Sequence, residues 1–228
     1  MIVLGIDTGG SACSVALTRD ASLLSRDVVP MRHGHARHLA PLIDRLLAQS
    51  EIRPAELDLI GVTVGPGGFT GLRVGLAAAG GLALATGARI VGVSSFEAVA
   101  ASCRPLTGEE KRAIVIDSRR AEPYLQIFDA DGTVGSADWR RVAALAEDLS
   151  AQGVRLLAGD GAPNVAAMSS LRQAALEATG PIDPVAVCRL ALVGAARGRS
   201  DPPPPVYLRP PDAKLPGGAT QPPIGHDR

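Results

Sequence analysis

The chain has 228 residues, of which 46% are hydrophobic and 20% are charged, a balance that excludes general disorder and a fibrous repeat. Lysine and arginine together number 23, as do aspartate and glutamate, and aromatic residues make up 3%. A global basic field and a set of base-stacking rings are therefore excluded, so any nucleic-acid contact is expected to be local or made through a partner.

The first half of the sequence alternates strand-like and helix-like patterns. In chain order we expect strands at residues 2–6, 14–18 and 23–29, a helix at 38–50, a strand at 57–64, a glycine-rich loop at 65–68, a helix at about 70–86, a strand at 89–93 and a short helix from Ser95. The three opening strands are expected to form a meander.

The second half is expected to be α/β as well, after a change in composition at residues 104–110. Its expected elements are strands at residues 113–117, 124–128 and 154–158 and helices at 139–151, 165–179 and 184–197. The predicted units are a domain at 1–103, a domain at 104–200, and a proline-rich tail at 201–228 that is extended or disordered.

A strand-ending aspartate occurs once in each half, as Asp7 and as Asp117. Two matching halves predict an α/β protein of two duplicated actin-like domains, with mixed sheets flanked by helices. In that architecture a nucleotide lies between the two domains. Asp117 is followed by Ser118, Arg119 and Arg120 instead of glycines, and these bulky side chains would hinder a second phosphate loop.

Asp7, Thr8, Gly9 and Gly10 form the first candidate site. A carboxylate at a strand end, followed by a glycine turn, can direct backbone amides at a phosphate and position a metal or a water. The alternative is a tight β-hairpin, since glycine turns between strands are common. The residues alone leave both interpretations open.

The second candidate is the loop at residues 65–73, which leads from a strand into a helix. The amino terminus of that helix could hold an anion with Arg73 nearby, but the sequence lacks the Gly-Lys-Ser/Thr of a Walker loop. The favoured interpretation is structural: glycine and proline shape a corner and Thr70 caps the helix. The small residues Gly71, Gly75 and Ala79 then let another helix approach.

His33, His35 and His38 form the third candidate. The last two could begin a metal site on one helical turn, but no carboxylate is nearby, and Arg32 and Arg37 oppose a cation. We therefore favour a polar helix start and predict no metal site. The sequence also lacks a nucleophile elbow or another local catalytic signature, so no catalytic residue is predicted.

The compartment is predicted to be the cytoplasm, without a membrane contact. The three cysteines are far apart and include no C-x-x-C pair, which favours a reducing environment. Residues 1–7 have no positive leader and are expected to form a strand. The longest apolar stretch, residues 74–86, is too short and too rich in glycine to span a bilayer.

Over essentially the whole predicted folded region the sequence resembles the TsaB family, also called YeaZ. Agreement is found at residues 6–8, in the first helix at His35, Leu39 and Pro41, and at 115–124 and 205–209. The most specific part is a signature loop that contains Gly65, Pro66, Gly67, Gly68, Phe69, Thr70, Gly71 and Arg73. The departures are Gly10 and Gly68, where the family usually has hydroxyl residues, Ala36 in place of a common serine, and a longer proline-rich end.

This resemblance implies a non-catalytic subunit for making N6-threonylcarbamoyladenosine beside the anticodon of tRNAs that read codons beginning with A. The implied partners are the paralogue TsaD, which transfers the threonylcarbamoyl group, and the ATPase TsaE, with tRNA held mainly through the complex. No cofactor is expected on this chain alone, so Asp7 to Gly10 would be a vestigial nucleotide site. ATP or ADP and metal are expected on partner subunits or at shared interfaces.

The first two predicted helices are the expected partner surface. Their apolar stripes could form half of a four-helix interface with TsaD, and in isolation they could pair two copies of this chain. The alternative is that the stripes cover the chain's own sheet. The predicted contact residues are Leu39, Leu42, Ile43, Leu46, Leu47, Leu72, Leu76 and Ala79.

Two enzymatic alternatives remain. An M22-like metallopeptidase, a label that this branch of the superfamily has attracted, would need a bound metal and a general base. A small-molecule kinase of the actin-like superfamily would need ATP bound at residues 7–10.

Overall fold

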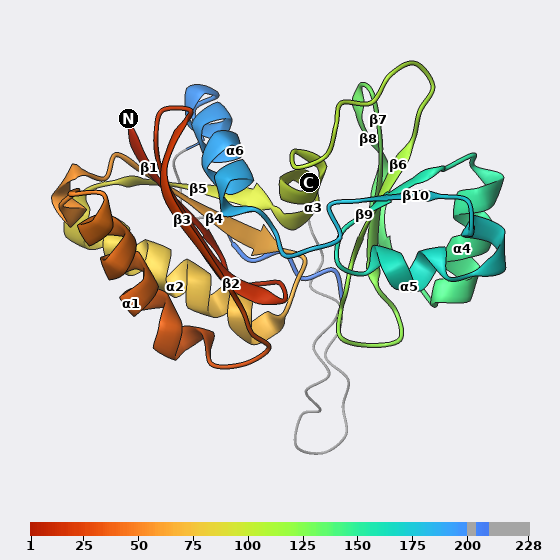
Figure 1. Ribbon diagram of the computed structural model, residues 1–228, viewed down its shortest axis with the longest axis horizontal. Coiled ribbons are helices and arrows are strands. Elements are labelled where there is room, and N and C mark those ends of the chain that lie inside the picture. Colours follow the sequence, from red (N-terminus) through yellow and green to blue (C-terminus); the bar gives the residue numbers. More distant parts are fainter. Residues whose placement is uncertain (200–203, 210–228) are drawn as a thin grey trace.

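A mixed five-stranded sheet forms the centre of the first half of the chain in the computed structural model, which describes residues 1–199 and 204–209 (Figure 1). Its strands are β1 (Ile2–Asp7), β2 (Ala12–Arg19), β3 (Ser22–Pro30), β4 (Leu59–Gly65) and β5 (Arg89–Ser94). β1 pairs antiparallel with β2 and parallel with β4, and all six of its residues are buried. The strand order is therefore β3-β2-β1-β4-β5, with β1 in the middle.

Helices cover both faces of this sheet (Figure 1). They are α1 (His35–Gln49), α2 (Phe69–Thr86), α3 (Ser95–Ala100) and α6 (Pro184–Ala196), and a short 3-10 helix, η1 (Pro54–Glu56), precedes β4. α1 and α2 contact each other and share one apolar core with β1 and β4. α1 begins at His35, before the predicted residue 38, because Gly34 adopts the left-handed conformation with a φ of 91° and starts the first turn.

α6 packs on the first sheet although it follows the second in the sequence. Glycines in two strands make room for it: a Cβ on Gly5 would lie 2.4 Å from the Pro184 carbonyl oxygen, and one on Gly61 would lie 2.7 Å from the Ala191 Cβ. We call the first sheet with α1, α2, α3 and α6 the first lobe. The predicted boundary at residue 104 falls between α3 and the second sheet. The second unit was expected to run to residue 200 but ends before α6.

A second five-stranded sheet repeats the topology of the first. Its strands are β6 (Arg112–Ile116), β7 (Tyr124–Asp129), β8 (Gly132–Trp139), β9 (Leu156–Ala158) and β10 (Ala175–Glu177), in the order β10-β9-β6-β7-β8. β6 pairs antiparallel with β7 and parallel with β9, as β1 does with β2 and β4. With α4 (Val142–Ala151), α5 (Ala162–Ala166) and the 3-10 helix η2 (Ser169–Leu171) it forms the second lobe. The predicted duplication is confirmed.

Two predictions in the second lobe are wrong. The helix expected at residues 165–179 is instead the end of α5, η2 and β10, because Ala175 to Glu177 pair with β9 at the sheet edge. Pairing of this kind overrides helix propensity. β8 was not expected, and its last residue, Trp139, lies where a helix was predicted to start. β8 has no buried residue, so it lacks the apolar alternation that marks a strand.

A short part of the predicted tail, residues 204–209, connects the two lobes. The Val206 amide donates to the Val64 carbonyl at 2.7 Å in the first lobe. The Arg209 guanidinium pairs with Glu122 at 3.1 Å and lies 5.3 Å from the centre of the Trp139 ring in the second lobe. The rest of the predicted tail lies outside the described residues.

α2 has 18 residues with a mean hydropathy of 1.3, enough by length and composition to cross a membrane. A core helix passes the same test, and α2 buries Leu72 and Ala79 against the first sheet. Only 22% of the helix is buried in the first lobe, so this packing explains one side of α2 and leaves the other side exposed.

Candidate functional site

Asp7 lies at the end of β1, with its side chain fully buried. Its Oδ1 accepts hydrogen bonds from the Thr63 hydroxyl at 2.6 Å and from the Gly9 amide at 3.2 Å, while Oδ2 has no partner in the described part of the chain. Burial raises the pKa of Asp7 to about 6, and the bonds from Thr63 and Gly9 partly oppose that rise. Thr63 was not predicted as a site residue, although it is the one polar residue of β4.

The two glycine-rich candidates, residues 8–10 and the signature loop, pack directly against each other. The Gly68 amide donates to the Gly9 carbonyl at 2.8 Å, and the Thr8 hydroxyl donates to the Gly71 carbonyl at 2.7 Å. A Cβ on Gly71 would lie 1.9 Å from the Thr8 carbonyl oxygen, closer than any real contact. Glycine is therefore needed here so that two stretches of backbone can touch.

Two details of the predicted signature loop are wrong. α2 starts at Phe69 after Gly68, without a side-chain cap, so Thr70 does not cap the helix. At Gly71 and Gly75 the small-residue face packs on Thr8 instead of on another helix, whereas Ala79 lies in the core that α2 shares with α1. A Cβ on Gly75 would lie 2.5 Å from the Thr8 hydroxyl oxygen, so this face is filled by Thr8.

Arg119 of the second lobe reaches across to the first lobe at the same point. Its guanidinium donates to the Arg32 carbonyl at 2.8 Å and to the Gly10 carbonyl at 2.7 Å. Asp117, the counterpart of Asp7, is exposed, and its carboxylate accepts from the Arg119 amide at 2.7 Å. At the position equivalent to residues 7–10, the second lobe therefore has a turn whose Arg119 side chain contacts the first lobe.

The space between the lobes is small beside these residues. Gly10 and Pro66 from the first lobe and Ile116 and Asp160 from the second line a cavity of about 10 Å³, roughly the size needed for one water. Burial raises the pKa of Asp160, whose carboxylate accepts from the Asp117 amide at 2.9 Å. In this arrangement the Gly9 amide donates to Asp7, the Gly68 amide donates to the Gly9 carbonyl, and the Gly10 carbonyl accepts from Arg119.

Arg119→Ala is expected to loosen the contact between the lobes. Removing two hydrogen bonds from an exposed charged donor costs about 1 kcal/mol, so the amides at residues 9–12 and 32–34 should exchange hydrogen about fivefold faster. Hydrogen exchange followed by mass spectrometry measures this. The neighbouring substitution Ser118→Ala serves as the control, and unchanged exchange in Arg119→Ala would show that the two bonds do not hold the lobes.

Within the described residues, no three histidine, cysteine, aspartate or glutamate side chains lie together in a way that could hold a metal ion. His35 is buried, its Nε2 has no hydrogen-bond partner among the described residues, and burial lowers its pKa. His33 and His38 are exposed. The histidines predicted as a polar helix start therefore lie at the beginning of α1, with His35 turned into the protein.

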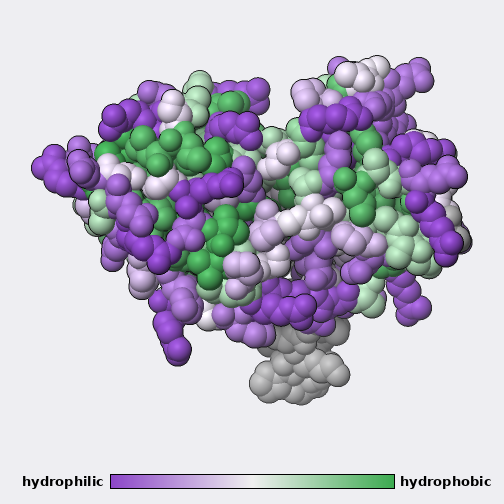
Figure 2. Space-filling model, viewed as in Figure 1, coloured by the Kyte–Doolittle hydropathy of each residue, from purple (hydrophilic) through white to green (hydrophobic). Residues whose placement is uncertain are grey.

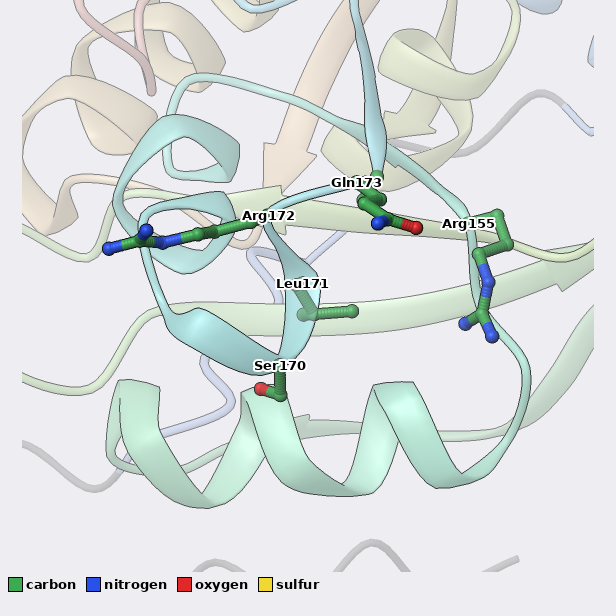
Figure 3. A pocket seen from close by; sticks show the side chains of 6 residues that line it. Arg155, Ser170, Leu171, Arg172 and Gln173 are labelled. Carbon is green, nitrogen blue, oxygen red and sulfur yellow. The ribbon is translucent and has the colours of Figure 1, made fainter.

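A roomier cavity of about 300 Å³ lies in the second lobe, away from Asp7 and Arg119. It is lined by Arg155, beside β9, and by residues 170–174, which run from within η2 to the start of β10 (Figure 3). In the close-up the Arg172 side chain extends to the left, away from Arg155, whose side chain runs downward at the right. The two arginines do not converge on one point, and the cavity shares no residue with the site between the lobes.

The residues predicted to contact a partner lie mostly in the core of the first lobe. Those with 6% exposure or less are Leu39, Leu42, Ile43, Leu46, Leu47, Leu72 and Ala79, and Leu76 is partly buried against the same core. The alternative interpretation, that the stripes cover the chain's own sheet, describes these side chains. Large apolar residues that are exposed on the first lobe include Phe69 and Leu84 of α2, and Figure 2 shows hydrophobic surface on this lobe.

The sequence is similar to the TsaD family model, to a TsaB protein and to an uncharacterized mycobacterial protein. A family model described as TsaD, tRNA N6-adenosine threonylcarbamoyltransferase, matches residues 26–180. An uncharacterized protein of Mycobacterium tuberculosis is 34% identical over 217 residues, which cover 93% of each chain. The TsaB protein of Escherichia coli, named for tRNA threonylcarbamoyladenosine biosynthesis, is 31% identical over 131 residues, 58% of this chain and 56% of that protein.

Solved structures agree with these relatives. The crystallised YeaZ of Pseudomonas aeruginosa superposes with a TM-score of 0.74 at 29% identity, covering 91% of this chain and 99% of that one. A second Pseudomonas aeruginosa chain, described as similar to the peptidase YEAZ, superposes with a TM-score of 0.77 at 29% identity, and a more distant chain shares the fold at a TM-score of 0.50 and 10% identity. These structures confirm the predicted actin-like architecture.

Proposed function

Since the chain belongs to the TsaB/YeaZ-like family of proteins related to the transferase TsaD, we propose that it is a non-catalytic subunit that binds TsaD. The complex would make N6-threonylcarbamoyladenosine in tRNA in the cytoplasm, with TsaE as a further partner. The observation that supports the proposal is the packing of residues 8–10 against the signature loop, because the Gly9 and Gly68 amides donate to groups of the chain itself. In this proposal the chain contributes a binding surface for TsaD and no catalytic group.

The docking surface we propose is the outward face of α2. Leu84 is 90% exposed there, and Cβ atoms on Gly80 and Gly81 would meet nothing within 4 Å. An exposed leucine beside small residues lets a partner helix approach closely and bury apolar area. The same face would join two copies of this chain when TsaD is absent.

We further propose that the chain alone binds no nucleotide or metal and that tRNA is held mainly through TsaD. The mutual hydrogen bonds of the glycine loops support the first part. The equal numbers of acidic and basic residues support the second, because phosphate binding needs an excess of positive charge.

The test is to mix the purified chain with the TsaD of the same organism. Light scattering after size exclusion should show a heterodimer, and formation of the modified tRNA by the full set of enzymes should depend on this chain. Leu84→Glu should abolish the complex, whereas Leu176→Glu, at a leucine 47% exposed on the second lobe, should not. A charge at Leu46, which is 1% exposed, would test folding instead. No complex with the unaltered chain would contradict the proposal.

A further inference from the structure

Arg73 is held in a fixed position at the start of the outward face of α2. It follows Phe69 by one helical turn, and its guanidinium carbon lies 3.8 Å from the centre of the Phe69 ring. Its Nε donates to the Tyr207 hydroxyl at 3.0 Å. The two rings lie 5.1 Å apart and are tilted by 33°. An aromatic face and a hydrogen bond therefore fix the direction of this cation.

Tyr207 comes from the C-terminal segment, 134 residues away in sequence from Arg73. That segment is fixed beside α2 by the bond between the Val206 amide and the Val64 carbonyl. The cluster of Phe69, Arg73 and Tyr207 thus joins two parts of the chain, and Phe69 remains 47% exposed.

The Arg73 guanidinium has no carboxylate partner within the described residues, and its two terminal nitrogens make no hydrogen bond there. Several other arginines are paired with carboxylates, as Arg104 is with Glu110, Arg112 with Glu177 and Arg209 with Glu122. Arg73 is therefore ordered by the protein while its paired donors face outward. Two parallel donors of this kind match a carboxylate.

We propose that Arg73, positioned by Phe69 and Tyr207, binds a carboxylate of TsaD and anchors the docking surface on α2; this inference rests on the proposed function. The cluster is continuous with that surface, since Phe69 and Arg73 begin the helix that also carries Leu84. Tyrosine and arginine are the residue types that dominate binding energy at protein interfaces. Because both side chains are already ordered, binding loses little conformational freedom.

A protein partner fits this cluster better than a nucleic acid does. Phe69 is 47% exposed, but Arg73 lies over one face of its ring and Tyr207 packs beside it, so that face is not available to a stacked base. The chain also has no net positive charge, whereas binding to a phosphate backbone rests on clustered cations.

The test compares dissociation constants for TsaD of the same organism, measured by calorimetry. Arg73→Ala should weaken binding about 30-fold, as expected for an interface hot spot. Arg73→Lys should weaken it about tenfold, because lysine keeps the charge but loses the paired donors. Tyr207→Phe removes only the hydroxyl that orients Nε and should weaken binding about threefold. Arg172→Ala, an exposed arginine on the second lobe, is the control with the same charge change and should bind normally.

The outcomes separate the two proposals. If the unaltered chain binds TsaD and Arg73→Ala binds equally well, this inference is wrong while the proposed function stands. If the unaltered chain does not bind TsaD, both are wrong. If Arg73→Ala binds TsaD normally but loses affinity for an unmodified tRNA transcript, measured by fluorescence anisotropy, the cluster contacts nucleic acid, and the assignment to a protein carboxylate is overturned. Thermal unfolding of each variant, expected to match the unaltered chain, shows that binding and not folding has changed.

Discussion

Gly71→Ala is expected to lower the free energy of unfolding by about 3 kcal/mol, the upper end of what overpacking costs. The added Cβ would lie 1.9 Å from the Thr8 carbonyl oxygen and 3.0 Å from the Thr8 carbonyl carbon. Neither atom belongs to a flexible side chain, so the helix or the strand end must move. Any such movement also strains the hydrogen bond from the Thr8 hydroxyl to the Gly71 carbonyl.

Gly80→Ala in the same helix is the matched control. A Cβ on Gly80 would meet nothing within 4 Å, so this substitution is expected to raise the free energy of unfolding by about 0.5–1 kcal/mol, as alanine favours a helix over glycine. Urea unfolding of both variants measures the two effects, which should have opposite signs. An equal small change in both would show that residues 8–10 and α2 do not pack as tightly as described.

The tight packing at Gly71 bears on function because phosphate binding and loop packing need the same atoms. A glycine loop binds a phosphate through free backbone amides. Here the Gly68 amide donates to the Gly9 carbonyl, and the Gly9 amide donates to the Asp7 carboxylate. A phosphate that used these two amides would have to displace their present acceptors.

The architecture could be predicted because its signals are local. The run of apolar residues that ends at Asp7, and its repeat before Asp117, mark equivalent central strands in the two sheets. The site could not be assembled in the same way. Thr8 and Gly71 are 63 residues apart, and Arg119 and Gly10 are 109 apart, so no periodicity within one element reports their contact. Two separate glycine-rich runs were visible in the sequence, but nothing in either indicated that each was the other's partner.

The partner surface shows a different limit of sequence analysis. Helical periodicity finds an apolar side of a helix but not what covers it. Leu46 is 1% exposed and Leu84 is 90% exposed, although both are leucines on helices of the same lobe. Leu84 was not predicted as a contact residue because it lies outside the apolar stripe of its helix. For the same reason its side chain is not covered by the core and stays exposed.

Asp7→Asn is expected to remove a pH-dependent change of about 3 kcal/mol in the free energy of unfolding. Burial raises the pKa of Asp7 from its ordinary value of 3.8 to about 6, so the folded state holds a proton on this carboxyl that the unfolded state has lost. As the pH rises from about 4 to about 6, ionisation of the buried group increasingly costs folding free energy, and above that range the cost is constant. A shift of roughly two units corresponds to about 3 kcal/mol.

Asparagine has nearly the same shape, does not titrate, and keeps an oxygen for the bonds from Thr63 and Gly9. The unfolding free energy of the unaltered chain minus that of Asp7→Asn should therefore fall between pH 4 and 6, as measured by urea unfolding at a series of pH values. Thr63→Val provides a second check. It removes the hydrogen bond that favours the carboxylate form, so the fall should extend to higher pH. A difference that stays flat from pH 4 to 7 would mean that the folded protein carries Asp7 as a carboxylate throughout, stabilised by a group that reaches Oδ2.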